Sequence, residues 1–179
     1  GGMKPTVLVR VAFDGEAVTF RNLREMEEDE LAQRKNRVRT ISPGTARGRM
    51  LGGNLTVLTS ILGSPYVPDF TGAILFLEDT DEAPYRVDRM MTQLKLAGIL
   101  EKVRGVVFGE CTDCEPGEGS YGSLTLEEIL TDHLKPLGIP AWHNAMIGHI
   151  PKQFTVPVGV EVEIDAAAGA IRMVEPAVL

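Results

Sequence analysis

The chain has 179 residues, 44% of them hydrophobic and 24% charged, and its formal net charge is −7 at pH 7. This composition is typical of a globular domain, and the negative charge argues against a surface that neutralises nucleic-acid phosphates or anionic lipids. The apolar runs fall far short of the ~18 residues that span a bilayer and no secretory leader is visible, so we expect a cytoplasmic protein with neither nucleic-acid nor membrane partners.

The organisation along the chain suggests a main domain with an N-terminal appendage. Residues 1–3, Gly-Gly-Met, resemble an expression scar, which leads us to expect an excised piece of a longer protein. We interpret residues 4–44 as a hairpin with a connecting segment and residues 45–179 as the main domain.

The first half of the chain contains short alternating apolar runs and one helical pattern. In chain order these predict strands at residues 6–13 and 17–23 that form a hairpin, a charged connector or solvated helix at 24–37, strands at 38–41 and 46–51, and a helix at 54–62. Asn54 is a suitable N-cap for this helix, and Gly63 is a suitable C-terminal stop.

The second half alternates strands with helices. The predicted elements are a strand at residues 73–78, a helix at 84–97, a strand at 103–108, a helix at 126–135, and a terminal hairpin at 158–164 and 170–174. Pro84 suits the first turn of its helix, and Thr125 with Glu128 forms a capping box for the next helix. Strands that alternate with helices, with antiparallel hairpins at both ends, predict a mixed three-layer α/β fold.

Glu78 and His149 form the candidate site. Glu78 ends an apolar strand, and His149 lies in a Gly-His-Ile-Pro turn, so both side chains can stand at strand ends on a rigid scaffold. An alternative remains open for the carboxylates at residues 78–82, because the N-terminus of the following helix also favours negative charge. We interpret His133 as a residue at the edge of a helix face and His143 as a strand-end packing residue.

Two further motifs are interpreted as loops. Residues 117–122 match G-x-G-x-x-G, but the preceding strand ends several residues earlier and Glu118 would place a negative charge beside a phosphate, so we expect no dinucleotide cofactor. Cys111 and Cys114 form C-x-x-C without a second ligand pair for zinc and without the helix start of a redox motif. We therefore expect free thiols in a loop and no bound metal.

Four segments resemble the LD-carboxypeptidase family of serine peptidases. They are Gly52-Gly53-Asn54-Leu55, the Ala-Ile-Leu-Phe-Leu-Glu-Asp run at residues 73–79, residues 84–90 with Gln93-Leu94, and Gly148-His149 with Pro157-Val158-Gly159. Their order and separations are similar to those of the family over residues 45–179. Residues 14–51 also resemble the connecting region of the microcin-immunity branch.

The resemblance implies a swivelling β/β/α-type C-terminal domain. It also implies hydrolysis of the amide before a terminal D-alanine in murein tetrapeptides during cytoplasmic recycling, whereas the immunity branch cuts an amide in peptide–nucleotide conjugates. Glu78 and His149 match the acid and base of the family, but no serine of the chain has the strand-turn-helix setting of its nucleophile. The serines are Ser42, Ser60, Ser64, Ser120 and Ser123. We therefore expect a partner N-terminal domain that carries the serine, and no hydrolysis by this chain alone.

In the implied mechanism, His149 takes the serine proton and returns it to the leaving amine, while Glu78 fixes the tautomer of the ring. Asn54 and Lys152 are candidate substrate contacts, although helix capping for the first and a solvated charge for the second are simpler interpretations. Two alternatives remain open: a non-catalytic module that binds peptidoglycan peptides, and a carrier phosphorylated on His149. The sequence also leaves open whether the chain forms a homodimer.

Overall fold

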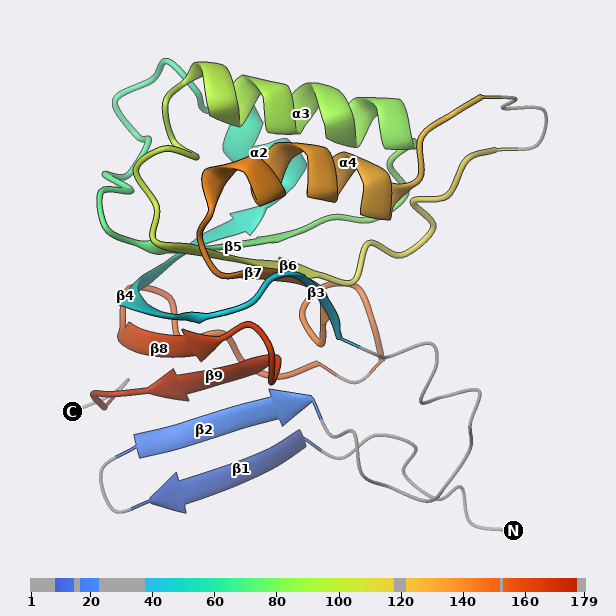
Figure 1. Ribbon diagram of the computed structural model, residues 1–179. Helices are drawn as coiled ribbons and strands as arrows, with labels where there is room; N and C mark the ends of the chain where they lie inside the picture. The colour runs from blue at the N-terminus through green and yellow to red at the C-terminus, as the bar shows by residue number, and fades with distance from the viewer. Residues whose placement is uncertain (1–8, 15–16, 23–37, 118–121, 152, 177–179) are drawn as a thin grey trace, which may run out of the picture.

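The computed structural model describes residues 9–14, 17–22, 38–117, 122–151 and 153–176 (Figure 1). Its strands are β1 (Val9–Asp14), β2 (Ala17–Asn22), β3 (Arg39–Ser42), β4 (Thr45–Asn54), β5 (Ile74–Glu78), β6 (Gly105–Gly109), β7 (Ala141–Ala145), β8 (Glu161–Asp165) and β9 (Ala170–Met173). Its helices are α2 (Leu55–Ser60), α3 (Pro84–Leu96) and α4 (Leu126–Leu134), followed by the short 3-10 helix η1 (Lys135–Leu137). None of these described helices has the length and apolar character needed to cross a membrane.

The long strand β4 belongs to both halves of the sheet. Over the described residues the strand order is β1-β2-β9-β8-β4-β5-β6-β7-β3. The first half of β4, residues 45–49, pairs antiparallel with β8, and residues 50–54 pair parallel with β5. The strands β5, β6 and β7 continue in parallel, whereas β8, β9, β2 and β1 continue antiparallel. β4 therefore connects a parallel region with an antiparallel one.

The two faces of the parallel strands pack against different layers. In β5, Leu75 and Leu77 belong to the apolar cluster that includes the buried residues of α2, α3 and α4. Ile74 and Phe76 belong to a second cluster, which includes the buried residues of β8 and β9, as the two-residue period of a strand requires. Figure 1 shows the helices on one side of β5, β6 and β7, and β8 and β9 on the other. This confirms the predicted three-layer α/β fold of the swivelling β/β/α type.

Several boundaries differ from those predicted. β4 runs to Asn54 because the preceding glycine pair continues the ladder with β5 instead of forming a turn. The helix α2 then ends at Ser60, earlier than its apolar pattern suggested. β8 begins only at Glu161, since Val160 donates a turn hydrogen bond to the carbonyl oxygen of Pro157. Parts of the predicted N-terminal hairpin and the charged connector at residues 24–37 lie outside the described residues.

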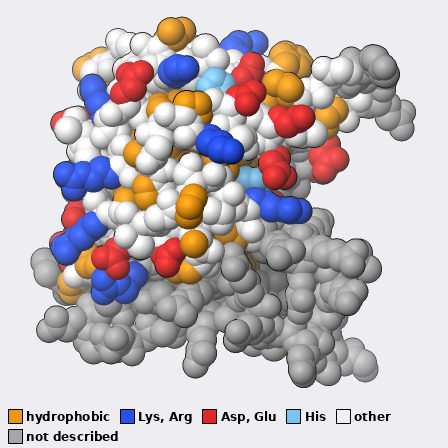
Figure 2. Space-filling model, viewed as in Figure 1, with side chains coloured by type: hydrophobic (Ala, Val, Ile, Leu, Met, Phe, Trp, Pro, Cys, Tyr) orange, Lys and Arg blue, Asp and Glu red, His pale blue; other side chains and the backbone are white. Residues whose placement is uncertain are grey.

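Charges of both signs are interspersed on the surface. On the face shown in Figure 2, described basic and acidic side chains alternate with apolar ones and do not gather into one basic stripe. Arg47 lies 3.2 Å from Glu161, which links β4 to β8, and Arg172 lies 2.8 Å from Glu163, which links β9 to β8. Exposed pairs of this kind contribute only about 0–1 kcal/mol each, so the buried clusters dominate the stability of the fold.

Candidate active site

The loops that follow β5, β6 and β7 meet at the carboxyl edge of the parallel strands. Glu110, directly after β6, donates its backbone N–H to the carbonyl oxygens of Ala145 and Ile147 at 3.1 and 3.0 Å. Thr80 and Thr112 form a parallel bridge between the loops after β5 and β6. This edge is where open α/β sheets generally bind their ligands, so its loops are in a suitable place for a functional site.

Glu78 and His149 lie together at this edge. The Nδ1 atom of His149 is 3.1 Å from Oε2 of Glu78. The Glu78 side chain is 13% exposed and that of His149 is 62% exposed, so the fold holds the carboxylate while the imidazole is open to solvent. A carboxylate only accepts hydrogen bonds, so this contact favours the tautomer with the proton on Nδ1 and leaves Nε2 as an acceptor. The pair has the geometry of a base that is oriented by an acid.

Two glycines allow the loop of His149 to lie close to β6. Gly148 is buried with a φ of 126°, and a Cβ at this position would lie 2.7 Å from the carbonyl oxygen of Glu110. A Cβ at Gly109, the last residue of β6, would lie 2.3 Å from the carbonyl oxygen of Ile147. Neither position has room for a side chain, so the location of His149 depends on both glycines.

Asp79 ties the start of α2 to the end of β5. Its side chain is 3% exposed and accepts hydrogen bonds from Nδ2 of Asn54 at 3.1 Å and from the backbone N–H of Thr80 at 2.9 Å. It also accepts from the backbone N–H and the hydroxyl of Thr56, at 3.0 and 2.9 Å. Asn54 is the N-cap of α2, as predicted, because its Oδ1 accepts from the backbone N–H of Val57. The candidate substrate contact Asn54 therefore lies beside Glu78 at the end of β5, but it also has a structural role.

The loop after β6 corrects one prediction. Cys111 and Cys114, which we expected to be free thiols, are joined by a disulfide, and their Cα atoms are 5.5 Å apart. The hydroxyl of Thr112, between them, donates to the carbonyl oxygen of His149 at 3.3 Å. The carbonyl oxygen of Thr112 accepts from the backbone N–H of Asp81 at 2.8 Å. This turn therefore contacts both loops that carry the candidate site.

The other two histidines have structural environments. Nε2 of His133 is 2.8 Å from Oδ1 of Asp88, which links α4 to α3 at the edge of the helix layer. His143 is 8% exposed within β7, and burial lowers its pKa, an effect that Glu127 opposes and Arg39 reinforces. His143 is buried as we predicted, but it lies in the middle of β7 and not at a strand end.

Three of the described serines make local hydrogen bonds, and a fourth, Ser42, lies at the end of β3. The hydroxyls of Ser60 and Ser123 donate to carbonyl oxygens of their own segments, and that of Ser64 accepts from a backbone N–H two residues away. Ser120 and the candidate substrate contact Lys152 lie outside the described residues. Among the residues that the structure describes, no group of three or more metal-binding side chains occurs.

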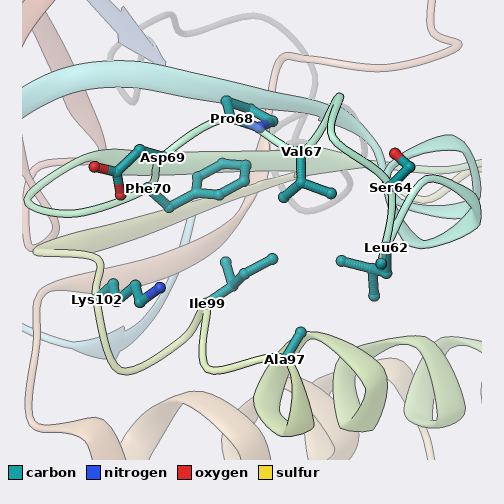
Figure 3. Close-up of a pocket in the computed structure, with 10 residues that line it drawn as sticks. Leu62, Ser64, Val67, Pro68, Asp69, Phe70, Ala97, Ile99 and Lys102 are labelled. Carbon is teal, nitrogen blue, oxygen red and sulfur yellow. The ribbon is translucent and has the colours of Figure 1, made fainter.

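A shallow pocket lies at the opposite, amino edge of the parallel strands. It has a volume of about 170 Å³ and is formed by the segment before β5 and the turn after α3 (Figure 3). Among its lining residues Phe70 and Ile99 are buried, whereas Asp69 and Lys102 are exposed. Hydrogen bonds from Thr71 lower the pKa of the Asp69 carboxyl. Because both segments precede their strands, this pocket is separate from the dyad.

Asp79 and Thr112 contribute to the site although the sequence did not single out either residue. Asp79 is part of the family motif after β5, but its burial depends on donors that come from the start of α2. The position of Thr112 between two cysteines is its sole sequence signal, and that signal becomes informative only once the cysteines are known to be paired.

Comparison with known proteins identifies the family. Residues 47–164 match the family model of the LD-carboxypeptidase C-terminal domain, which is more than half of the chain. The chain therefore belongs to the LD-carboxypeptidase family, as its motifs predicted.

Curated relatives share this part of the chain. A putative carboxypeptidase of Synechocystis sp. is 44% identical over 128 residues, which cover 72% of this chain and 42% of the relative. A probable murein peptide carboxypeptidase of Bacillus subtilis is 41% identical over 125 residues, covering 70% of this chain and 39% of the relative. The chain thus spans about two fifths of the length of these relatives.

Solved structures have the same fold. The muramoyltetrapeptide carboxypeptidase of Oxalobacter formigenes superposes with a TM-score of 0.67 at 34% identity, covering 75% of this chain and 47% of that one. The immunity protein MccF, in complex with glutamyl sulfamoyl guanosine, superposes with a TM-score of 0.71 at 30% identity, covering 80% and 42%. Another MccF structure is described as an active-site mutant in which a serine, an asparagine and a lysine are replaced by alanine.

Proposed function

We propose that this chain is the domain of a cytoplasmic serine LD-carboxypeptidase that supplies the acid and the base of a Ser-Glu-His triad. The substrate is a murein tetrapeptide, and the bond that breaks is the amide before its terminal D-alanine. The serine comes from the N-terminal part of the longer protein. The observation that carries this proposal is the 3.1 Å contact between Nδ1 of His149 and Oε2 of Glu78.

The chemistry follows from the two ring nitrogens of His149. A serine hydroxyl is a weak nucleophile at neutral pH, so its proton must move to Nε2 as its oxygen attacks the carbonyl carbon. The Glu78 carboxylate accepts the Nδ1 hydrogen bond and stabilises the imidazolium that forms. The imidazolium then gives its proton to the departing D-alanine amine, and water repeats the sequence on the acyl-enzyme.

The substrate class rests on the relatives. The probable murein peptide carboxypeptidase and the muramoyltetrapeptide carboxypeptidase share this domain, which supports a murein peptide as the substrate. An MccF structure described as an active-site mutant has an asparagine replaced by alanine, and on that residue type we assign a substrate-contact role to Asn54. The amide of Asn54 carries two hydrogens and its bond to Asp79 uses one, so the other can reach a ligand at the carboxyl edge.

D-alanine release from a murein tetrapeptide tests the proposal. We expect no release by this chain alone and release by a full-length protein that includes the N-terminal part. In that protein, Glu78→Gln and His149→Gln should each lower kcat by roughly 10⁴-fold or more, because triad members act as a unit. The control is Glu101→Gln, an exposed carboxylate after α3 at the other edge of the sheet, which should retain full activity. Release by the isolated chain, or full activity of Glu78→Gln, would refute the triad.

The likeness to MccF favours a second candidate substrate class. MccF binds glutamyl sulfamoyl guanosine and superposes well on this chain, so an aminoacyl sulfamoyl nucleoside is the alternative. Comparison of kcat/KM for the two substrate classes, measured with the same full-length protein, decides between them. A module that only binds peptidoglycan peptides would instead give calorimetric affinity for the tetrapeptide with this chain alone and no turnover in the full-length protein.

A further inference from the structure

We propose that Thr112, held in a turn closed by the Cys111–Cys114 disulfide, is the residue that positions His149 against Glu78, and that reduction of the disulfide loosens this contact. The inference deepens the function proposed above, because positioning matters only if the dyad acts as a base. Thr112 is a positioning residue and does not touch the substrate.

The contacts of Thr112 join the two loops that carry the dyad. Its hydroxyl donates to the carbonyl oxygen of His149 at 3.3 Å, which fixes the backbone of that residue. Its carbonyl oxygen accepts from the backbone N–H of Asp81 at 2.8 Å and from the hydroxyl of Thr80 at 3.3 Å. These two residues lie two and three positions after Glu78 along the chain. One residue thus bridges the acid-bearing and base-bearing loops from the third loop of the edge.

The disulfide fixes the backbone that presents Thr112. Cys114 is 3% exposed and Cys111 packs partly buried against the main apolar cluster, so the closed ring is attached to the fold at both ends. Within the ring Asp113 adopts a φ of 57°, in the left-handed region, which costs free energy for a non-glycine residue although aspartate tolerates it better than most. Opening the ring restores the freedom of Thr112 and Asp113, and the bond to His149 becomes less populated.

The rest of the loop does not depend on this turn. The backbone N–H of Glu110 holds the carbonyl oxygens of Ala145 and Ile147, and Phe154 donates to the carbonyl oxygen of Met146 at 3.1 Å. These bonds remain when the disulfide opens. The expected effect is therefore local to His149 and leaves the fold intact.

The redox step is an ordinary thiol–disulfide exchange with a dithiol reductant. A reductant thiolate attacks Sγ of Cys111, the less buried of the two cysteines, and the S–S bond breaks with Cys114 leaving as a thiolate that takes up a proton. The second thiol of the reductant then displaces Cys111, which is also protonated. Two electrons and two protons pass to the protein, and the reductant becomes a disulfide. In a cytoplasmic protein, a disulfide is usually transient or redox-sensing, which suits such a switch.

Nitrogen NMR of the histidine rings tests the inference on this chain alone. At a pH where the rings are neutral, the ¹⁵N shifts report which nitrogen of each ring carries the proton. We expect Nδ1 to be protonated in oxidised His149, and the ratio of Nδ1-H to Nε2-H to fall roughly threefold to tenfold in Thr112→Val, the change expected when one hydrogen bond is lost. Thr112→Ser keeps the hydroxyl and should behave as the wild type.

Reduction of the disulfide is the second perturbation, and the other two histidines serve as internal controls. A dithiol reductant, or the double replacement Cys111→Ser with Cys114→Ser, should reproduce the change in His149, and the double variant should no longer respond to reductant. His133 pairs with Asp88 of α3 and His143 lies within β7, so their signals should stay constant. Unchanged His149 signals in Thr112→Val and on reduction would overturn the inference, and so would equal changes in all three rings. Because no substrate or serine is needed, this result is independent of whether the protein hydrolyses murein peptides.

Discussion

Replacement of Asp79 by asparagine tests whether the start of α2 is held to β5 by a buried carboxylate. Each carboxylate oxygen of Asp79 accepts two hydrogen bonds. Oδ1 accepts from the side chain of Asn54 and the backbone N–H of Thr80, and Oδ2 accepts from the backbone N–H and the hydroxyl of Thr56. An asparagine has one acceptor oxygen, so its amide nitrogen must face at least one backbone N–H. The least costly arrangement places that nitrogen toward Thr56, whose hydroxyl can rotate to accept while its backbone N–H loses its partner.

The magnitude follows from this count. The backbone N–H of Thr56 loses its acceptor, and the remaining hydrogen bonds to residue 79 weaken because the carboxylate charge is gone. Together these changes lower the unfolding free energy by about 1–3 kcal/mol. For a chain of this size the melting temperature should then fall by about 3–10 °C. Urea unfolding and thermal melts of Asp79→Asn measure both quantities.

A matched control separates burial from the hydrogen bonds themselves. The exposed Asp69 also accepts from the backbone N–H and the hydroxyl of one threonine, Thr71, at 3.0 and 2.7 Å. Asp69→Asn should be much less destabilising, because water replaces the lost partner. Equal urea midpoints for the Asp79 and Asp69 variants would refute the reasoning.

Two further changes have effects of predictable direction. Gly148→Ala should lower the unfolding free energy by about 2–4 kcal/mol, because the new Cβ adds a close contact to the backbone strain. The control is Gly159→Ala, where φ is 85° and no atom lies within 4 Å of the added Cβ, and it should cost only about 1 kcal/mol. Equal urea midpoints for the two variants would contradict the crowding at Gly148. Because burial lowers the pKa of His143, the unfolded chain binds a proton at this residue more readily than the folded chain does. The contribution of His143 to the unfolding free energy is therefore complete above the pKa of the unfolded chain, about 6.5, and is lost as the pH falls below it. The slope of this loss is at most about 1.4 kcal/mol per pH unit. The wild type should therefore lose more stability than His143→Phe between pH 7.5 and 5.5 in urea titrations, and parallel losses would contradict this prediction.

The layered fold and most element types could be predicted from the sequence because their signals are local. The capping box of Thr125 and Glu128 begins α4 as predicted, and Pro84 begins α3. The predicted ends of elements were wrong where pairing with a distant strand determines where the element stops. Gly52 and Gly53 have φ values of 142° and 153°, which glycine alone tolerates in a strand, so a pair that suggests a turn continues β4 instead.

Some residues of the candidate site could be predicted from local sequence signals, and others only become recognisable in the folded structure. Glu78 and His149 could be selected because each follows an apolar segment and matches a family motif, and the structure brings their side chains together. Asp79 is a charged residue beside other charged residues, and only the donors contributed by Asn54 and Thr56 make it a buried one. The C-x-x-C spacing allows a thiol pair, a ligand pair or a disulfide, and sequence spacing alone does not distinguish them.

The dual pairing of β4 also constrains the order in which the chain can be assembled. Its second half can dock on β5 soon after both are synthesised, since these strands are close along the chain. Its first half must wait for β8, which lies more than 100 residues further along the chain. A nascent or truncated chain that ends before β8 would therefore expose an unpaired strand edge and an uncovered apolar face, and would be prone to aggregate until the β8–β9 hairpin has formed.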